Sequence, residues 1–217
     1  MKPIVCIVGR SGTGKTTLIE KIIPLLNKRG YRICTLKHDV HGFEMDKEGK
    51  DTWKHKNAGA AGTAISYLNK IGLIMDIEKE LTPEQIANRF FATADLIIAE
   101  GFKKTALPKI EVHRKEVNDE LLCLPQENLV ALVSDTKTLP GIPSLKWNET
   151  EKLADIIEEK IIKTFREADI QLEVNGMNIP LKPFIADMLS AMIFGSVAAL
   201  KNCENAREIS IRVKKNK

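Results

Sequence analysis

The sequence predicts an α/β protein built on a doubly wound, mostly parallel sheet. Short, continuous apolar runs such as Ile4–Val8 and Leu129–Val133 end at glycine or polar residues, which is typical of strands covered on both faces. These runs alternate along the chain with segments of helical apolar spacing, such as residues 16–29. Alternation of this kind favours a parallel sheet with helices on both sides.

The first strand, helix and second strand form one unit. Residues 2–8 are expected to be a strand and residues 16–29 a helix that Gly30 terminates, because glycine favours the C-capping position. Residues 31–36 form the next strand, joined by a right-handed connection. The other elements expected in this domain are a short helix over 51–58, a hairpin of 63–68 with 72–77, a helix from the N-cap Thr82 to about Ala92, strands over 95–99, 108–113 and 129–133, and a helix over 149–165.

A change of rhythm near Arg166 predicts two domains, residues 1–167 and residues 168–217. The second is expected to be a small α+β appendage with the order ββαβ. Its hairpin turns at Asn175-Gly176, its helix covers Phe184–Leu200, and the alternation of Ile209, Ile211 and Val213 predicts a last strand.

Composition excludes several classes of protein. With 43% hydrophobic and 29% charged residues, the chain is neither disordered nor of low complexity. Aromatic residues make up only 5% and the net charge is +4, which argues against a nucleic-acid-binding protein. The longest apolar stretch, Phe184–Leu200, is short for a membrane span and contains Asp187. The four cysteines form no Cys-x-x-Cys pair, and Met-Lys-Pro leads directly into a strand, so we expect a cytoplasmic protein.

The loop Gly9–Thr16 matches G-x-x-x-x-G-K-[ST] in full, between a predicted strand and a predicted helix. This context indicates the phosphate loop (P-loop) of a nucleoside triphosphatase. Backbone N–H groups of residues 12–17 would surround the β-phosphate, Lys15 would reach the β- and γ-phosphates, and Thr16 would offer its hydroxyl to Mg²⁺. The predicted nucleotide-binding residues of this segment are Gly9, Ser11, Gly12, Thr13, Gly14, Lys15, Thr16 and Thr17.

Acidic residues flank the buried strand 95–99, and one of them is expected to complete the magnesium site. Catalytic groups in open α/β sheets lie beyond the carboxyl ends of the strands, which favours Glu100 over Asp95. Thr16 and Glu100 are therefore the predicted metal-binding pair. Asp95 is interpreted as a polar strand start.

Base selection points to Asp135. The guanine-reading string N/T-K-x-D is absent, but Asp135 follows the strand Leu129–Val133 where a base-reading loop would lie. Its carboxylate could accept both donors of a guanine edge. A turn built on Ser134-Asp135 explains the same residues equally well.

The segment between the second strand and residue 52 also lies at the carboxyl edge and has the composition of a switch. Asp39, Asp46 and Asp51 could position a water molecule or join the outer shell of the magnesium. We take Lys15, Asp39 and Asp51 as the candidate catalytic residues. His38 and His41 could meet a metal or an anionic phosphate, although two histidines alone rarely form a metal site.

With the phosphate loop, the strings Lys37-His38-Asp39-Val40-His41, Gly49-Lys50-Asp51-Thr52 and Ala99-Glu100-Gly101-Phe102-Lys103 resemble the molybdopterin-guanine dinucleotide biosynthesis protein B (MobB) family. The resemblance covers roughly residues 1–165. It implies a homodimeric, GTP-binding accessory protein of molybdenum cofactor biosynthesis with weak GTPase activity and with GTP and Mg²⁺ as its ligands. The partners that it implies are the guanylyltransferase that joins GMP to molybdopterin, molybdopterin or its guanine dinucleotide, and molybdoenzymes that receive the cofactor.

Two other classes of function are compatible with a phosphate loop. A small-metabolite kinase would usually carry an arginine-rich lid, and only Arg89 lies between Arg32 and Arg114. A metal-insertion GTPase would favour a histidine-rich tract or a Cys-x-x-Cys pair, and neither is present.

Overall fold

The computed structural model describes residues 2–39, 42–44, 46–165, 170, 172–175, 177–179, 181–206, 209–211 and 213. The chain divides into two compact units, Lys2–Phe165 and Arg166–Lys217. In chain order the elements are β1 (Ile4–Val8), α1 (Lys15–Lys28), β2 (Ile33–Lys37), α2 (Asp51–Asn57), β3 (Gly62–Tyr67), β4 (Lys70–Met75), α3 (Pro83–Phe90), β5 (Leu96–Glu100), β6 (Lys109–Val112), η1 (Pro125–Glu127), β7 (Leu129–Val133), β8 (Ser144–Leu145), α4 (Thr150–Ile157), the π-helical turn η2 (Glu158–Ile162), β9 (Leu172–Val174), β10 (Met177–Ile179) and α5 (Pro183–Ala198).

The first unit is organised around a six-stranded sheet with the order β2-β5-β1-β6-β7-β8, in which every pair of neighbours is parallel. The central strand β1 is buried along its whole length and β5 is buried up to its last residue, Glu100, as the continuous apolar runs predict. The predicted α/β class is confirmed. The two-residue strand β8 was not predicted, because two residues carry no periodic pattern.

Two apolar layers cover the sheet, one on each face. Alternate residues of β1 divide between them, with Val5 and Ile7 in one layer and Ile4, Cys6 and Val8 in the other. The first layer is closed by α1 and α4 through Leu18, Ile22, Leu26, Leu153 and Ile157. The second is closed by Ala87 of α3 together with Ala94, Cys123 and neighbouring loop residues.

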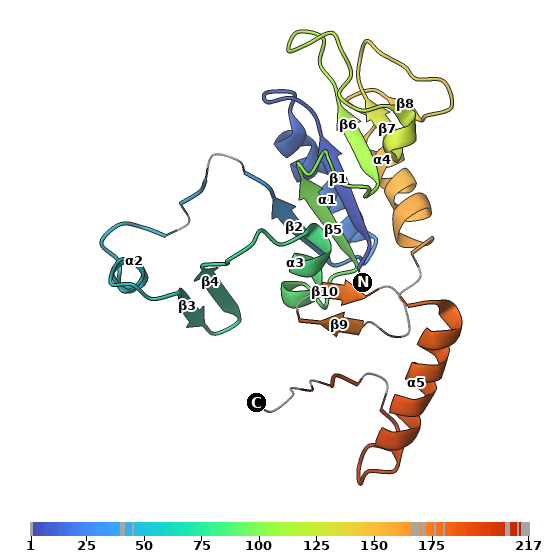
Figure 1. The fold of residues 1–217 in the computed structure, drawn as a ribbon. Coiled ribbons are helices and arrows are strands. Elements are labelled where there is room, and N and C mark those ends of the chain that lie inside the picture. The colour runs from blue at the N-terminus through green and yellow to red at the C-terminus, as the bar shows by residue number, and fades with distance from the viewer. Residues whose placement is uncertain are drawn as a thin grey trace. The chain divides into compact units, whose positions relative to one another are not determined.

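Helix α2 and the hairpin β3–β4 form an excursion to one side of this sheet (Figure 1). Lys56 ties the excursion together, since its Nζ lies 2.9 Å from the Ala60 oxygen and 2.7 Å from Asp76 Oδ2. Many of its apolar side chains are exposed: Ile65, Tyr67, Leu68, Ile71, Leu73 and Met75. This set is named the hairpin surface below.

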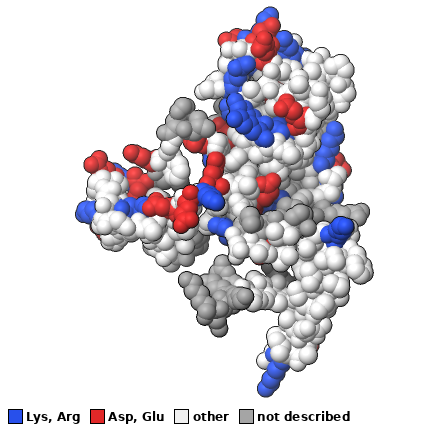
Figure 2. Space-filling model, in the orientation of Figure 1, with Lys and Arg blue, Asp and Glu red and all other residues white. Residues whose placement is uncertain are grey.

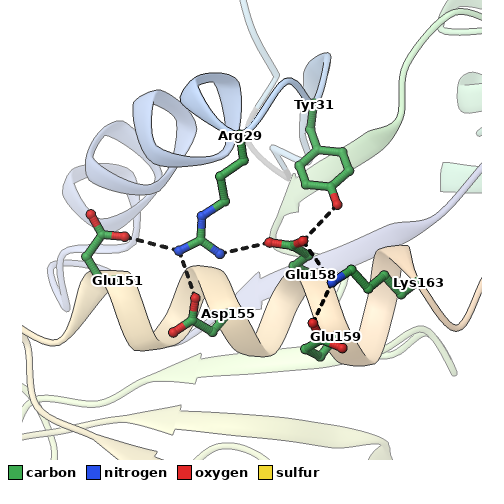
Figure 3. A network of polar contacts seen from close by, with 7 residues as sticks. All are labelled: Arg29, Tyr31, Glu151, Asp155, Glu158, Glu159 and Lys163. Atoms are coloured by element: carbon green, nitrogen blue, oxygen red, sulfur yellow. Dashed lines mark hydrogen bonds and ion pairs between the residues drawn. The ribbon is translucent and has the colours of Figure 1, made fainter.

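The far end of α1 is fastened to α4 by ion pairs (Figure 3). Arg29 reaches Glu151 at 3.1 Å, Asp155 at 2.8 Å and Glu158 at 2.9 Å. Tyr31 donates its hydroxyl hydrogen to the other oxygen of Glu158, at 3.0 Å. This cluster stabilises the amino-terminal edge of the sheet, opposite to the phosphate loop.

The second unit contains the antiparallel hairpin β9–β10 and the apolar helix α5, as predicted. The predicted last strand is wrong in the described part of the chain. Ile209, Ile211 and Val213 lie outside any strand, and Ile211 and Val213 are exposed. Alternation gives a strand only where a neighbouring strand offers its backbone, so the described order of this unit is ββα. Gly176 of the expected turn lies outside the described residues.

No helix in the described part of the chain is both long and apolar enough to cross a bilayer.

Candidate functional site

The phosphate loop connects β1 to α1, and glycine is required at its two ends. Gly9 has a φ of 152°, and a Cβ there would lie 2.4 Å from the backbone oxygen of Val112. Gly14, the N-cap of α1, has a φ of 93° and lies against the ring of Trp147. No side chain caps the helix, and its first turn contains no acidic residue. The positive end of α1 therefore faces the loop without a capping side chain or an acidic residue of its own first turn.

Lys15 folds back onto the loop. Its Nζ donates hydrogen bonds to the carbonyl oxygens of Gly9 at 3.1 Å and Arg10 at 2.9 Å. Burial lowers the pKa of the Lys15 ammonium, Glu100 opposes this shift, and Lys37 adds to it. The ammonium is thus held at the mouth of the loop by weak neutral acceptors, which a phosphate oxygen can replace.

Thr16 and Glu100, the predicted metal-binding pair, are in contact. Thr16 Oγ1 donates to the Glu100 carboxylate, with distances of 3.1 Å and 3.3 Å to its two oxygens. Glu100 is the last residue of β5, directly beside Ile7 of β1 and Lys37 of β2 in the sheet register. Two adjacent parallel strands therefore bring this carboxylate to the first turn of α1.

Asp95 lies at the other end of the same strand. Its Oδ2 accepts a hydrogen bond from the backbone N–H of Arg32 at 2.7 Å, which fixes the starts of β2 and β5. The interpretation as a polar strand start agrees with this contact.

The segment after β2 meets the site through its first residue. The backbone N–H of His38 continues the ladder to the Glu100 oxygen at 3.0 Å, and Asp39 follows directly. The His38 ring lies 4.9 Å from the Phe102 ring and 2.8 Å from Glu80 Oε1. Phe102 has a φ of 56° next to Gly101 at 100°, so the backbone is strained just beyond the carboxylate. His41 lies outside the described residues.

The remaining acids of the predicted switch lie farther along the chain. Asp46 Oδ1 accepts from Lys47 N at 2.9 Å and from Thr52 Oγ1 at 3.0 Å, which joins the segment to α2. Asp51 begins α2, is exposed, and pairs with Lys54 at 3.8 Å. The described contacts of Asp51 do not reach the phosphate loop.

Asp135 follows β7 and is exposed. Its Oδ1 accepts a hydrogen bond from the backbone N–H of Trp147 at 3.2 Å, so it joins the loops that follow β7 and β8. Ser134 Oγ accepts hydrogen bonds from the N–H groups of Thr136 at 3.2 Å and Lys137 at 3.1 Å. These contacts form a turn at Ser134-Asp135, which was the alternative to a base-reading loop.

Three residues beside the loop were not identified from the sequence. Arg114 Nε donates to the Thr13 carbonyl at 3.1 Å, and its guanidinium lies 4.5 Å from the centre of the Trp147 ring. His113 is buried, and its Nδ1 lies 2.9 Å from Ser134 Oγ. The same Ser134 oxygen accepts the N–H groups of Thr136 and Lys137, so it links His113 to the turn after β7. The one sequence signal for these residues is their position: His113 and Arg114 follow β6 and Trp147 follows β8, so all three lie at the carboxyl edge of the sheet.

Basic side chains gather at the end of the first unit where β1, the loop and β6 meet (Figures 1 and 2). Among the described residues, no group of three or more His, Cys, Asp or Glu side chains forms a metal cluster. The site therefore combines a cationic anion-binding loop with one hydroxyl–carboxylate pair. That arrangement suits a phosphate chain whose metal takes most of its oxygens from the ligand and water.

Comparison with known proteins identifies the relatives of this chain. The family described as "MobB: Molybdopterin guanine dinucleotide synthesis protein B" matches residues 4–135. The molybdopterin-guanine dinucleotide biosynthesis adapter protein of Haemophilus influenzae is 35% identical over 157 residues, which cover 72% of this chain and 88% of that protein. The putative adapter protein of Methanocaldococcus jannaschii is 25% identical over 246 aligned positions and covers 97% of both chains, so this similarity includes most of the second unit.

Among solved structures, the crystal structure of Bacillus subtilis MobB matches with a TM-score of 0.60 and 30% sequence identity, covering 73% of this chain and 98% of that one. The match to a structure and the matches to sequences agree on the phosphate-loop domain. The chain belongs to the MobB family.

Proposed function

We propose that this chain binds GTP with Mg²⁺ at its phosphate loop and acts as an accessory protein of molybdenum cofactor biosynthesis. The observation that carries the proposal is the pairing of an uncapped, lysine-bearing loop with the Thr16–Glu100 contact at 3.1 Å, in a member of the MobB family. Its relatives are named as adapter proteins of molybdopterin-guanine dinucleotide biosynthesis. The partner that this role implies is the guanylyltransferase that joins GMP to molybdopterin.

Thr16 and Glu100 are the proposed magnesium residues. A hydroxyl and a carboxylate are the oxygen donors that Mg²⁺ accepts in phosphate-loop sites, and the ion would neutralise charge between two phosphates. Glu100 would exchange its hydrogen bond from Thr16 Oγ1 for a contact with the hydrated ion. Lys15 would leave the Gly9 and Arg10 carbonyls for the phosphate oxygens.

Hydrolysis of GTP is proposed to be weak. Asp39 is the better of the two proposed acids for orienting a water molecule, because it directly follows the residue whose backbone bonds Glu100. Asp51 pairs with Lys54 on α2 and would need a movement of that excursion to take part.

Guanine preference is proposed to come from Asp135. Its Oδ1 holds the backbone of Trp147, so the carboxylate is already oriented at the edge where the nucleoside would leave the loop. The change Asp135→Asn should lower the ratio of GTP to ATP affinity in a calorimetric titration. An unchanged ratio would remove Asp135 from the base site.

A cytoplasmic homodimer is proposed from the family, with the hairpin surface as its contact. Leu68 is 90% exposed and Ile71 is 76% exposed, and apolar side chains so far out of a fold favour a partner surface. Sedimentation of the full chain and of Ile71→Lys should give a dimer and a monomer, respectively. A monomer for both would contradict the proposal.

A reconstituted reaction tests the accessory role. Purified guanylyltransferase, molybdopterin, GTP and Mg²⁺ are combined with this chain or with its Lys15→Ala variant, and formation of the guanine dinucleotide is followed. We expect the intact chain to increase the yield and the variant to fail. If both chains have the same effect, the phosphate loop is not used in this role. Molybdoenzymes that accept the cofactor and the dinucleotide itself are the further ligands to titrate.

A further inference from the structure

Trp147 lies directly against the phosphate loop. A Cβ added to Gly14 would be 2.7 Å from Cη2 of the indole, so the ring and the N-cap of α1 are in contact. Two cations lie over the same ring, Arg114 at 4.5 Å and Lys21 Nζ at 5.4 Å from its centre. The indole is only partly buried, so part of its surface is open beside the loop.

Three loops at the carboxyl edge hold this indole in place. β8 pairs with β7 through Leu145 and Val133, and Trp147 comes two residues after that pair. Asp135, beyond β7, accepts a hydrogen bond from the backbone N–H of Trp147. Arg114, beyond β6, bonds the Thr13 carbonyl with Nε and stacks on the ring. The ring is therefore fixed relative to the loop before any ligand binds.

The strand order tells which end of a nucleotide faces this ring. The proposed magnesium residue Glu100 ends β5, on one side of β1, while β6, β7 and β8 follow one another on the other side. If Glu100 holds the metal, the β- and γ-phosphate end of the triphosphate would be directed towards β5, because the metal of such sites acts on those phosphates. The α-phosphate and the nucleoside must leave the loop towards β6, β7 and β8, where Trp147 lies.

We propose that Trp147 forms the wall on which the nucleoside of the bound triphosphate packs, with Arg114 as the residue that positions it. This inference rests on the proposed binding of a nucleoside triphosphate at the loop. A purine has a polarisable face that stacks on an indole, and the guanidinium on the ring strengthens the platform. Stacking does not distinguish guanine from adenine, so Trp147 supplies affinity for the nucleoside and leaves selection to polar groups such as Asp135.

A purely structural role for Trp147 makes a different prediction. If the indole only fills the space between Gly14 and the stacked cations, its removal disturbs the loop, and every phosphate ligand loses affinity by the same factor. A nucleoside wall loses affinity only for ligands that carry a nucleoside. Inorganic tripolyphosphate has the phosphates of GTP without the nucleoside and separates the two cases.

The test is a calorimetric titration of the full chain with GTP, ATP and inorganic tripolyphosphate, each with Mg²⁺. For Trp147→Ala we expect GTP and ATP to bind about tenfold or more weakly, and tripolyphosphate to bind within about twofold of the unmodified chain. Trp147→Phe should retain most of the nucleotide affinity, since it keeps an aromatic face. The matched control is Trp53→Phe on α2, the other tryptophan of the chain, which should change none of the three affinities.

A fluorescence titration gives a readout that does not depend on removing Trp147. In the Trp53→Phe protein, the tryptophan emission comes from Trp147 alone. GTP should change the emission of Trp147 more than tripolyphosphate does, and it should also change the quenching of that emission by acrylamide more. Arg114→Ala should make the Trp147 ring more accessible to acrylamide and lower the affinity for GTP. Arg114→Lys should restore part of the protection and part of the affinity. If Trp147→Ala loses affinity for GTP and tripolyphosphate equally, or loses no affinity for GTP, Trp147 does not form a wall for the nucleoside. Failure of the unmodified chain to bind any of the three ligands would instead overturn the proposed function.

Discussion

The two ends of helix α1 are built in opposite ways. At the N-terminal end, Gly14 caps the helix with backbone alone, and the first turn of the helix contains no acidic residue. At the C-terminal end, the N–H of Gly30 bonds the Asn27 carbonyl at 2.9 Å and that of Tyr31 bonds the Leu26 carbonyl at 3.2 Å. Together these two hydrogen bonds form a Schellman motif.

The difference shows which end serves stability and which serves binding. At the C-terminal end, called the closed end below, Arg29 forms ion pairs with three carboxylates on α4 and η2, so its charge is paired within the fold (Figure 3). Lys15, at the open end, donates its hydrogen bonds to two neutral carbonyls among the residues that the structure describes. A helix end that lacks the usual cap carries a cost that a bound anion can remove, which is the physical basis of the phosphate site.

Replacing Lys15 at the N-terminal end of α1 should lower the affinity for GTP most. Lys15→Ala removes the cation that meets the β- and γ-phosphates, and we expect GTP affinity to fall about 100-fold, or ~3 kcal/mol. Thermal unfolding of the ligand-free protein should change little, because the lost bonds have neutral acceptors. The matched control is Lys28→Ala in the last turn of the same helix, which is exposed and should keep normal affinity. Titration calorimetry and a melting curve for each variant are sufficient.

The change Glu100→Gln should sharpen the assignment of the metal. With Mg²⁺ present, GTP affinity is expected to fall about tenfold, ~1.4 kcal/mol, because an amide oxygen binds the hydrated ion less well than a carboxylate. In EDTA the affinity should be equal or higher, since a negative charge near the phosphates has gone. Asp95→Asn, at the other end of β5, is the control and should leave the magnesium dependence intact. Equal losses with and without Mg²⁺ would show that Glu100 acts on the loop itself.

Much of the first unit could be predicted from its sequence because local pattern and tertiary role coincide there. Continuous apolar runs define the buried strands, and the capping box of Thr82 and Gln85 begins α3 where it was expected. The contact of Thr16 with Glu100 followed from the rule that the carboxyl ends of parallel strands share one edge. These features depend on short segments and on sheet topology, which one sequence reveals.

Other features depend on contacts between distant segments with no pattern of their own. Trp147 lies in the short segment before the helix expected over 149–165, and the β7–β8 pairing brings it to Gly14. The role of Arg114 needs the position of the Thr13 carbonyl, a hundred residues earlier in the chain. The strand expected at Ile209, Ile211 and Val213 failed for a related reason, because alternation cannot show whether a neighbouring strand is available.

Breaking the closed end should lower stability and leave binding intact. Arg29→Ala removes ion pairs to Glu151, Asp155 and Glu158, and exposed or partly exposed pairs of this kind contribute about 1 kcal/mol together. For a unit of this size we expect the melting temperature to fall by about 2–4 °C. The melting temperature of Arg29→Lys should lie between those of Arg29→Ala and the unmodified chain, since lysine keeps the charge and loses the forked geometry. GTP affinity should match that of the unmodified chain, and a parallel loss of affinity would contradict the separation of the two ends.

The smallest predicted effect is a pH dependence at the closed end. Hydrogen bonds from Lys163, Arg29 and Tyr31 lower the pKa of Glu158 from its ordinary 4.5 to about 2. A carboxyl whose pKa is lower in the folded state contributes stability above its unfolded pKa and loses it as the pH falls. The contribution should therefore be complete above about pH 4.5 and disappear as the pH approaches 2. Urea unfolding at a series of pH values should show a shallower decline over this window for Glu158→Gln than for the unmodified chain. Glu159→Gln, whose carboxylate pairs with Lys163, should keep most of the slope. If Glu158→Gln and the unmodified chain decline in parallel, the acid sensitivity of the protein arises elsewhere.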